Sequence, residues 1–166
     1  MSRAFLKEST LEAPEVRPRG LSALPLGAKN LLTPAGAERL RSELNALAQE
    51  RAAVTAKDSE EGKRALQLID ERMRPLADTL RTAEIVPPPT GNRTQVTFGA
   101  KVRVRDRLGA ISDYRLVGVA EARPEQSEVS YLAPIAQALL HARVGQKVPF
   151  RFPRGATELE ILGIEY

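Results

Sequence analysis

Cysteine is absent from this sequence of 166 residues, and no long apolar run occurs in it. Without cysteine the chain cannot form a disulfide framework, a thiolate nucleophile or a zinc–thiolate site, and this composition is typical of a reducing compartment. The first residues carry charges without a continuous apolar run, so they do not indicate a secretory signal. A membrane-spanning helix needs about 18 apolar residues in succession. We therefore expect a cytoplasmic protein without a membrane partner.

Aromatic residues and histidine are also scarce. Aromatics make up 4% of the chain, which leaves few rings for stacking on bases. The net charge of +4 is too small to indicate electrostatic binding to DNA, although the isoelectric point is near 9.7. The one histidine, His141, has no serine or acid at the spacing of a catalytic triad, which favours a surface or helix-capping role.

The residues that are present divide the chain into three parts, and 42% hydrophobic residues are enough for a folded core. Residues 1–30 contain prolines without a sustained period, which predicts an extended arm. Residues 31–86 repeat leucines at helical spacing. Residues 87–93 are a linker of proline and glycine, and residues 94–166 change to the alternating period of strands.

The helical part predicts an antiparallel coiled-coil hairpin. Thr33 is a good helix cap, and Pro34 suits the first helical position. Two apolar seams follow at steps of three, four or seven residues, interrupted only by Arg51, and a short connection joins them. Pro75 lies inside the second helix, where we expect a kink. The seam residues are Leu40, Leu44, Leu47 and Val54 in the first helix, and Leu66, Ile69, Met73, Leu76, Leu80 and Ala83 in the second.

The bend between these helices is acidic. It reads Lys57-Asp-Ser-Glu-Glu-Gly-Lys63, with three carboxylates. This composition is compatible with a solvated corner between two helices, whose charges keep it soluble, and also with a functional end of the hairpin.

The C-terminal part predicts a small antiparallel sheet with one short helix, so that the whole chain is an α+β protein of two domains. Val102 and Val104 alternate with charged residues, and the same alternation recurs around residues 148–152 and 158–161. A bulge near Leu162 would restore the inward direction of Ile164. Turns are expected at residues 106–109 and 154–155, and a helix is expected to open at Pro134.

A row of basic residues lies on one face of the first predicted strand: Lys101, Arg103, Arg105 and Arg107. This row is compatible with an ordinary wet sheet face and with docking on an acidic partner.

In order and spacing, residues 31–166 resemble the Gre transcript-cleavage factors. The stretches that carry the resemblance are Thr33-Pro-Ala-Gly-Ala-Glu-Arg-Leu-Arg-Ser-Glu-Leu44, Val96-Thr-Phe-Gly-Ala-Lys-Val102, Tyr114-Arg-Leu-Val-Gly118, Ala133-Pro-Ile-Ala-Gln-Ala-Leu-Leu140, Val144-Gly145 and Ile164-Glu-Tyr166. The resemblance implies a C-terminal domain similar in fold to the FKBP prolyl isomerases. It also implies an accessory factor, not an enzyme, which binds bacterial RNA polymerase and inserts its coiled coil toward the secondary channel.

The resemblance also implies a role for the bend. Asp58 and Glu61 have the spacing of the family's acidic pair, which helps to hold a catalytic Mg²⁺ ion shared with the polymerase. The chain itself is expected to hold no cofactor, to act as a monomer and to reach DNA or nascent RNA only through the polymerase. Candidate polymerase-contacting residues are Lys57, Glu60, Lys63, Arg103, Arg105 and Pro134.

Three interpretations of the bend remain open at this point: magnesium positioning, contact with polymerase without metal ligation, and a solvated corner. The hairpin is shorter than the family's by roughly seven residues per helix, or about 10 Å of reach. A shortened coil is similar to a second branch, the regulator of nucleoside diphosphate kinase (Rnk), which does not support cleavage and would occupy the channel as a competitor. The FKBP-like fold also suggests prolyl isomerisation, for which the sequence offers few aromatics to line a proline pocket.

Overall fold

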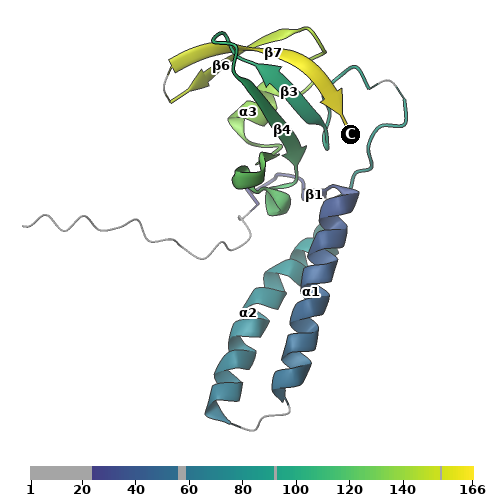
Figure 1. Cartoon of the computed structure of the whole chain (residues 1–166). Helices are drawn as coiled ribbons and strands as arrows, with labels where there is room; N and C mark the ends of the chain where they lie inside the picture. Colours follow the sequence, from purple (N-terminus) through teal and green to yellow (C-terminus); the bar gives the residue numbers. More distant parts are fainter. Residues whose placement is uncertain (1–23, 56–58, 92, 154) are drawn as a thin grey trace, which may run out of the picture.

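The computed structural model describes residues 24–55, 59–91, 93–153 and 155–166. It consists of a two-helix rod mounted on a compact C-terminal domain (Figure 1). The rod contains α1 (Pro34–Thr55) and α2 (Glu60–Thr82), which pack antiparallel and place their connecting bend at the end far from the domain. This confirms the predicted α+β fold with a helical hairpin.

Side chains just before each helix fix where it begins. The Gly36 amide donates to Thr33 Oγ1 at 3.0 Å, so Thr33 caps α1 as predicted. The Gly62 amide donates to Ser59 Oγ at 3.1 Å at the start of α2. Both helices therefore begin where a side-chain oxygen can accept from an otherwise unpaired amide.

The two predicted seams pack on each other along the rod. The buried or half-buried members of this core are Leu32, Ala37, Leu40, Leu44, Leu47, Val54, Ile69, Met73, Leu76, Leu80, Ala83 and Ala120. The predicted seam residue Leu66 is not among them. Arg51, which interrupts the first seam, pairs with Asp70 on the facing helix, with 2.6 Å between Nε and Oδ1. Pro75 is exposed, and α2 continues through it.

A short parallel pair of strands closes the base of the rod. Strand β1 (Leu31–Leu32) precedes α1 and pairs with β2 (Glu84–Ile85), which follows α2. Asn30 adds a side-chain hydrogen bond to the Thr79 carbonyl at 2.9 Å. Residues 1–23 of the predicted arm lie outside the described residues, whereas Lys29 is held to the domain through its carbonyl, which accepts from the Tyr131 hydroxyl at 2.8 Å.

The C-terminal domain is a curled five-stranded sheet in the order β5-β4-β3-β7-β6. Its strands are β3 (Lys101–Arg105), β4 (Ile111–Val117), β5 (Glu128–Ser130), β6 (Lys147–Phe152) and β7 (Gly155–Glu165). The prediction of a wholly antiparallel sheet is corrected at one edge, because β5 pairs parallel with β4. The chain passes from β4 to β5 through two short 3₁₀ turns, η1 (Val119–Glu121) and η2 (Pro124–Gln126). An antiparallel hairpin would need only a short turn at this point.

The predicted bulge and helix are confirmed. Between β3 and β7, Arg103 pairs with Gly163 and Val104 with Ile161, so Leu162 is the extra residue and Ile164 returns to the core. Helix α3 (Pro134–Leu139) covers the sheet and buries Leu139. His141 follows α3 with a φ of 67° and is exposed, and in the described part of the chain it belongs to no group of three side chains that could hold a metal ion.

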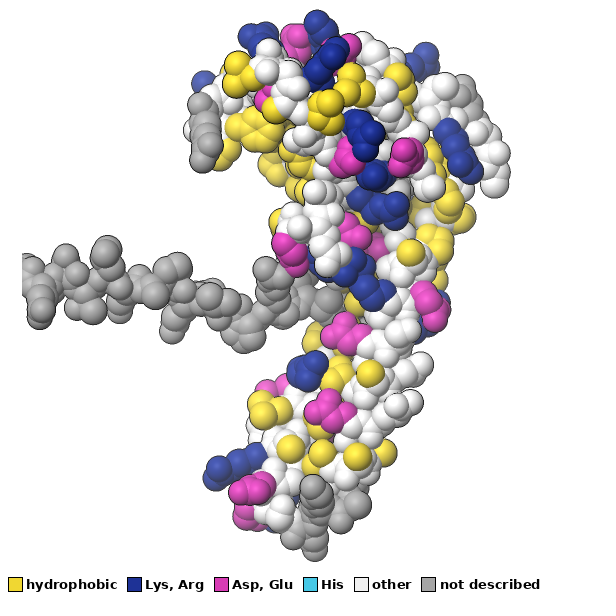
Figure 2. All heavy atoms as spheres, in the orientation of Figure 1, with side chains coloured by type: hydrophobic (Ala, Val, Ile, Leu, Met, Phe, Trp, Pro, Cys, Tyr) yellow, Lys and Arg dark blue, Asp and Glu magenta, His cyan; other side chains and the backbone are white. Residues whose placement is uncertain are grey.

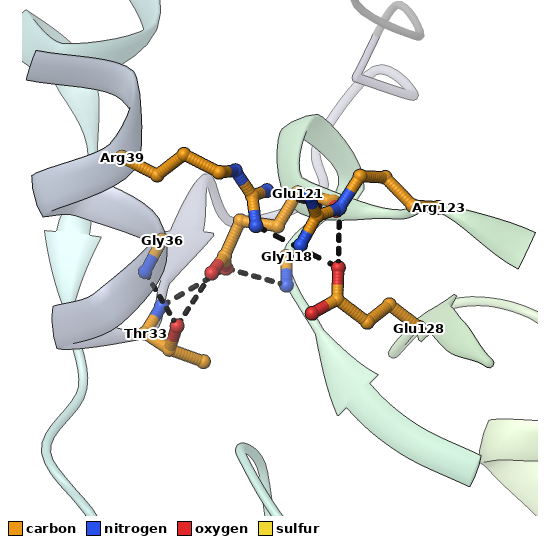
Figure 3. A network of polar contacts seen from close by, with 7 residues as sticks. All are labelled: Thr33, Gly36, Arg39, Gly118, Glu121, Arg123 and Glu128. Atoms are coloured by element: carbon orange, nitrogen blue, oxygen red, sulfur yellow. Dashed lines mark hydrogen bonds and ion pairs between the residues drawn. The ribbon is translucent and has the colours of Figure 1, made fainter. Parts of the chain in front are cut away.

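The rod and the domain meet at a polar joint beside β1 (Figure 3). There Glu121, in η1, accepts hydrogen bonds from Thr33 at the start of α1 and from Gly118 at the end of β4. Arg39 of α1 lies on the outside of the joint and donates to the Glu121 carbonyl at 3.1 Å. In the described residues, neither long helix is apolar enough to cross a bilayer.

Candidate functional site

The acidic bend lies at the end of the rod farthest from the domain. Helix α1 ends at Thr55 and α2 begins at Glu60, so four residues make the connection. The predicted site residues Lys57 and Asp58 lie outside the described residues. Glu60 and Glu61 occupy the first turn of α2, where the positive end of the helix dipole favours negative charge.

The described acids of the bend face water. Glu60 pairs with Lys63 one turn later, with 2.7 Å between Oε1 and Nζ. Glu61 is exposed, and its carboxylate has no ion pair with any described residue. No cluster of three metal-ligating side chains occurs within the described ranges. The described acids of the bend therefore do not form a complete site for a hard cation by themselves.

Three residues of the predicted basic row, Lys101, Arg103 and Arg105, lie on the face of β3 opposite the buried Val102 and Val104, and Arg107 lies in the turn after β3. Carboxylates accompany all four. Arg103 lies directly across from Asp113 of β4 and pairs with it at 2.8 Å. Arg105 lies across from Glu160 of β7 and pairs with it at 2.8 Å. Ion pairs also link Lys101 to Asp113 and Glu165, and Arg107 to Glu158. Each positive charge therefore has an internal partner, which reduces the net attraction of this face for an acidic surface.

These pairs shift the pKa values of the acids. Hydrogen bonds from the Arg103 guanidinium lower the pKa of Asp113 to about 2, and Lys101 adds to the effect. Arg105 lowers the pKa of Glu160 in the same way. Both acids therefore stay ionised at neutral pH and hold their arginines in place.

An apolar pocket opens on the side of the domain, where Figure 2 shows hydrophobic side chains gathered. It has a volume of about 620 Å³ and lies between α3 and β6. Phe150 and Phe152 meet edge to face there, with ring centroids 4.7 Å apart. The other lining residues are Tyr114, Pro134, Ile135, Arg151 and Pro153. The pocket contains three of the chain's seven aromatics. The few aromatics of the sequence are therefore concentrated here, which the sequence analysis of a proline pocket did not expect.

The structure brings the predicted residues to three separate places. Glu60, Glu61 and Lys63 lie at the bend, Arg103 and Arg105 lie on the outer sheet face, and Pro134 lines the pocket. Sequence reasoning missed the pocket aromatics and Glu121. The available signal for Glu121 was a single charge inside the apolar run Leu116-Val-Gly-Val-Ala-Glu-Ala122, and this glutamate is 1% exposed.

Comparison with known proteins bears on both parts of the molecule. A family model described as transcription elongation factor, GreA/GreB, C-terminal, matches residues 91–166. The chain is 35% identical over 154 residues to transcription elongation factor GreB of Neisseria meningitidis, covering 83% of this chain and 94% of the relative. It is 33% identical over 151 residues to transcription elongation factor GreB of Pseudomonas aeruginosa, covering 82% and 90%.

Among solved structures, the chain is similar to the GreA factor homolog Gfh1 of Thermus thermophilus. That likeness has 27% identity and a TM-score of 0.41, and it covers 84% of this chain and 100% of the other. The sequence relatives extend over the rod as well as the globular domain, because the matched length exceeds that of the C-terminal domain alone. Because of these similarities to curated relatives and to the family model, the chain belongs to the GreA/GreB family of transcription elongation factors.

Proposed function

We propose that the protein binds bacterial RNA polymerase through its globular domain and directs the rod toward the secondary channel, where the acidic bend promotes cleavage of backtracked RNA. The observation that carries this proposal is the position of the bend. It is the end of a narrow rod of about 33 Å and projects away from the domain (Figure 1). Family membership supplies the polymerase as the partner.

The globular domain offers a docking surface that does not interfere with the rod. The pocket of Pro134, Phe150 and Phe152 presents aromatic and apolar surface of the kind enriched at interface centres. The paired Arg103 and Arg105 lie on the opposite, exposed face of the sheet and would make a separate polar contact with the polymerase. DNA and nascent RNA are then reached only through the polymerase, and one copy of the chain is sufficient.

At the bend, Asp58 and Glu61 are the residues that we propose to act on the reaction. Carboxylate oxygens suit Mg²⁺, and an ion held mainly by the polymerase needs only one or two more of them. The exposure of Glu61 supports this role, because its oxygens remain available to a partner. The chain acts here as an accessory factor, and the bond is broken in the polymerase active site.

The test is RNA cleavage in purified backtracked complexes with the intact protein and with Asp58→Ala/Glu61→Ala. We expect cleavage with the intact protein and its loss in the double variant, while binding to polymerase is kept. Glu43→Ala/Glu50→Ala is the matched control, because it removes two exposed acids from the shaft of α1 and leaves the bend unchanged. Equal loss of cleavage in the control would contradict a specific role for the bend.

The noncatalytic alternative predicts a different result in the same assay. A rod that only occupies the channel would give no cleavage with the intact protein, and would inhibit a cleavage-competent Gre factor in proportion to its concentration. This alternative rests on the length of the rod, about 33 Å, because a shorter rod reaches less far into a channel. Absence of both cleavage and competition would contradict polymerase binding through the channel.

A further inference from the structure

The joint between rod and domain is built around one buried carboxylate. Glu121 is 1% exposed, and its two oxygens accept three hydrogen bonds. The Thr33 amide donates to Oε2 at 2.9 Å, the Gly118 amide donates to Oε2 at 2.8 Å, and the Thr33 hydroxyl donates to Oε1 at 2.5 Å. A buried charge is costly unless hydrogen bonds satisfy it, and these bonds do so without a cation on the carboxylate among the described residues.

The carboxylate belongs to the globular domain, but it accepts hydrogen bonds from the residue that begins the first helix of the rod. Thr33 is the residue that caps α1, and its hydroxyl also accepts from the Gly36 amide at 3.0 Å. Glu121 therefore lies at the first turn of α1, where unpaired amides and the helix dipole favour negative charge. A residue of the domain therefore completes the N-terminal cap of α1. This contact couples the direction of α1 to the position of η1.

Two glycines leave room for this contact. A Cβ built on Gly36 would lie 1.5 Å from Glu121 Oε1, so alanine there cannot coexist with the carboxylate in its present position. A Cβ on Gly118 would lie 1.9 Å from the Leu31 carbonyl oxygen and 2.8 Å from Glu121 Oε2. The surfaces of rod and domain are thus shaped to admit one side chain.

An outer layer of longer side chains surrounds the buried carboxylate (Figure 3). Arg39 of α1 donates to the Glu121 carbonyl and lies 3.6 Å from Glu128 of β5. Glu128 in turn accepts from Arg123 Nε at 2.7 Å. Arg39 therefore bridges the rod to two segments of the domain, so that α1 is held on more than one side.

We propose that Glu121 is the positioning residue of this joint: its carboxylate fixes the angle between the rod and the globular domain, and that fixed angle aims the bend. The aiming role rests on the function proposed above. For a rod of about 33 Å, a swing of about 10° at its base moves the bend by about 6 Å. Metal ligation tolerates only tenths of an ångström, so a rod that presents carboxylates to a metal needs a base that does not swing.

The angle can be measured without polymerase, so this test is independent of the proposed function. Because the chain has no cysteine, Gln49→Cys on α1 and Leu108→Cys on the turn after β3 accept two spin labels and no others. Both positions are exposed. Double electron–electron resonance on the full chain then gives the distance distribution between rod and domain, for which we expect one narrow peak.

Two single substitutions open the joint from opposite sides. Glu121→Ala removes the carboxylate, and Gly36→Ala displaces it while raising the intrinsic helix propensity of α1. We expect each to broaden the distance distribution at least about twofold, and Glu38→Ala, an exposed glutamate in the same turn of α1, to leave it unchanged. Unchanged distributions in both joint variants would overturn the proposal.

Two further variants separate positioning from a general loss of folding. In Glu121→Ala/Gly36→Ala the added methyl enters space that the carboxylate has left, so the double variant should be no broader than Glu121→Ala alone. Glu121→Gln keeps an oxygen that can accept from both amides, and it should restore the narrow peak. A glutamine variant as broad as the alanine variant would overturn the hydrogen-bonded joint. Gly36→Ala keeps the proposal falsifiable if Glu121→Ala does not fold.

Discussion

Two glutamates at opposite ends of the rod each lie beside the first turn of a long helix, but one is exposed and the other is buried. Glu61 lies in the first turn of α2 and is exposed to water. Glu121 lies against the first turn of α1, reaches it from another domain and is buried. Both complement the positive end of a helix dipole, so helix electrostatics alone does not distinguish their roles.

The difference between them lies in how many hydrogen-bonding positions remain for a partner. Glu121 gives both oxygens to groups of its own chain, and the residue is 1% exposed. Glu61 has no such bond with the described residues and keeps its oxygens for an external ligand. The buried glutamate therefore holds the molecule in shape, and the exposed glutamate is the one suited to act on something else.

The largest expected effect on stability comes from removing the carboxylate of Glu121, and removing that of Glu61 is the comparison. Glu121→Ala should lower the free energy of unfolding by about 2–4 kcal/mol, because it leaves two buried amides without acceptors. Glu61→Ala should change it by less than about 0.5 kcal/mol, since an exposed side chain loses little. Urea denaturation followed by far-UV circular dichroism measures both. Equal effects of the two substitutions would abolish the contrast between the ends of the rod.

The helices of the rod and the bulge of the sheet could be predicted from the sequence, because their signals are local. Leucines at steps of three and four placed the seam that packs Ile69 and Leu76, and Thr33 and Pro34 placed the start of α1. The bulge at Leu162 followed from an interrupted alternation of inward residues. In each case residues close in the chain carried the information.

The joint at Glu121 could not be predicted in this way, because its residues are far apart in the chain. Thr33 and Glu121 are separated by 88 residues, and nothing in the spacing of either indicates the other. The pairing of Arg103 with Asp113 depends on the register of β3 and β4, which a row of basic residues does not reveal. The parallel edge strand β5 was missed for a similar reason, since its direction follows from the path of η1 and η2.

A smaller effect is expected where an exposed carboxylate has a fixed cationic partner, an intermediate case between Glu61 and Glu121. The Arg103 guanidinium lowers the pKa of Asp113 to about 2 from an ordinary value of 3.8. Because the folded-state value is the lower one, the pair contributes stability above about pH 4, and this contribution is lost as the pH falls toward 2. Carboxyl ¹³C shifts should titrate near that value, and Arg103→Gln should raise the midpoint.

The control for this titration is Arg107→Gln, which removes a basic residue of the same row whose partner is Glu158. It should leave the midpoint of Asp113 unchanged. A midpoint near 3.8 in the unmodified protein would show that the hydrogen bonds from Arg103 do not persist in solution, and Asp113 would then resemble Glu61 in being free to bind elsewhere.

The smallest expected effect is at the ion pair that crosses the middle of the rod. Arg51 approaches Asp70 at 2.6 Å, and its hydrogen bond lowers the pKa of Asp70, but both side chains are about half exposed. Asp70→Asn should therefore lower the midpoint of thermal unfolding only slightly, since water and salt compete for exposed charges. This decrease should largely disappear at about 1 M salt, and Asp78→Asn, which removes an exposed acid paired with Arg81 on the same helix, should behave alike. A large loss of stability that salt does not reduce would show that Asp70, like Glu121, holds the rod in shape. Exposure alone would then no longer separate structural acids from acids that are available to a partner.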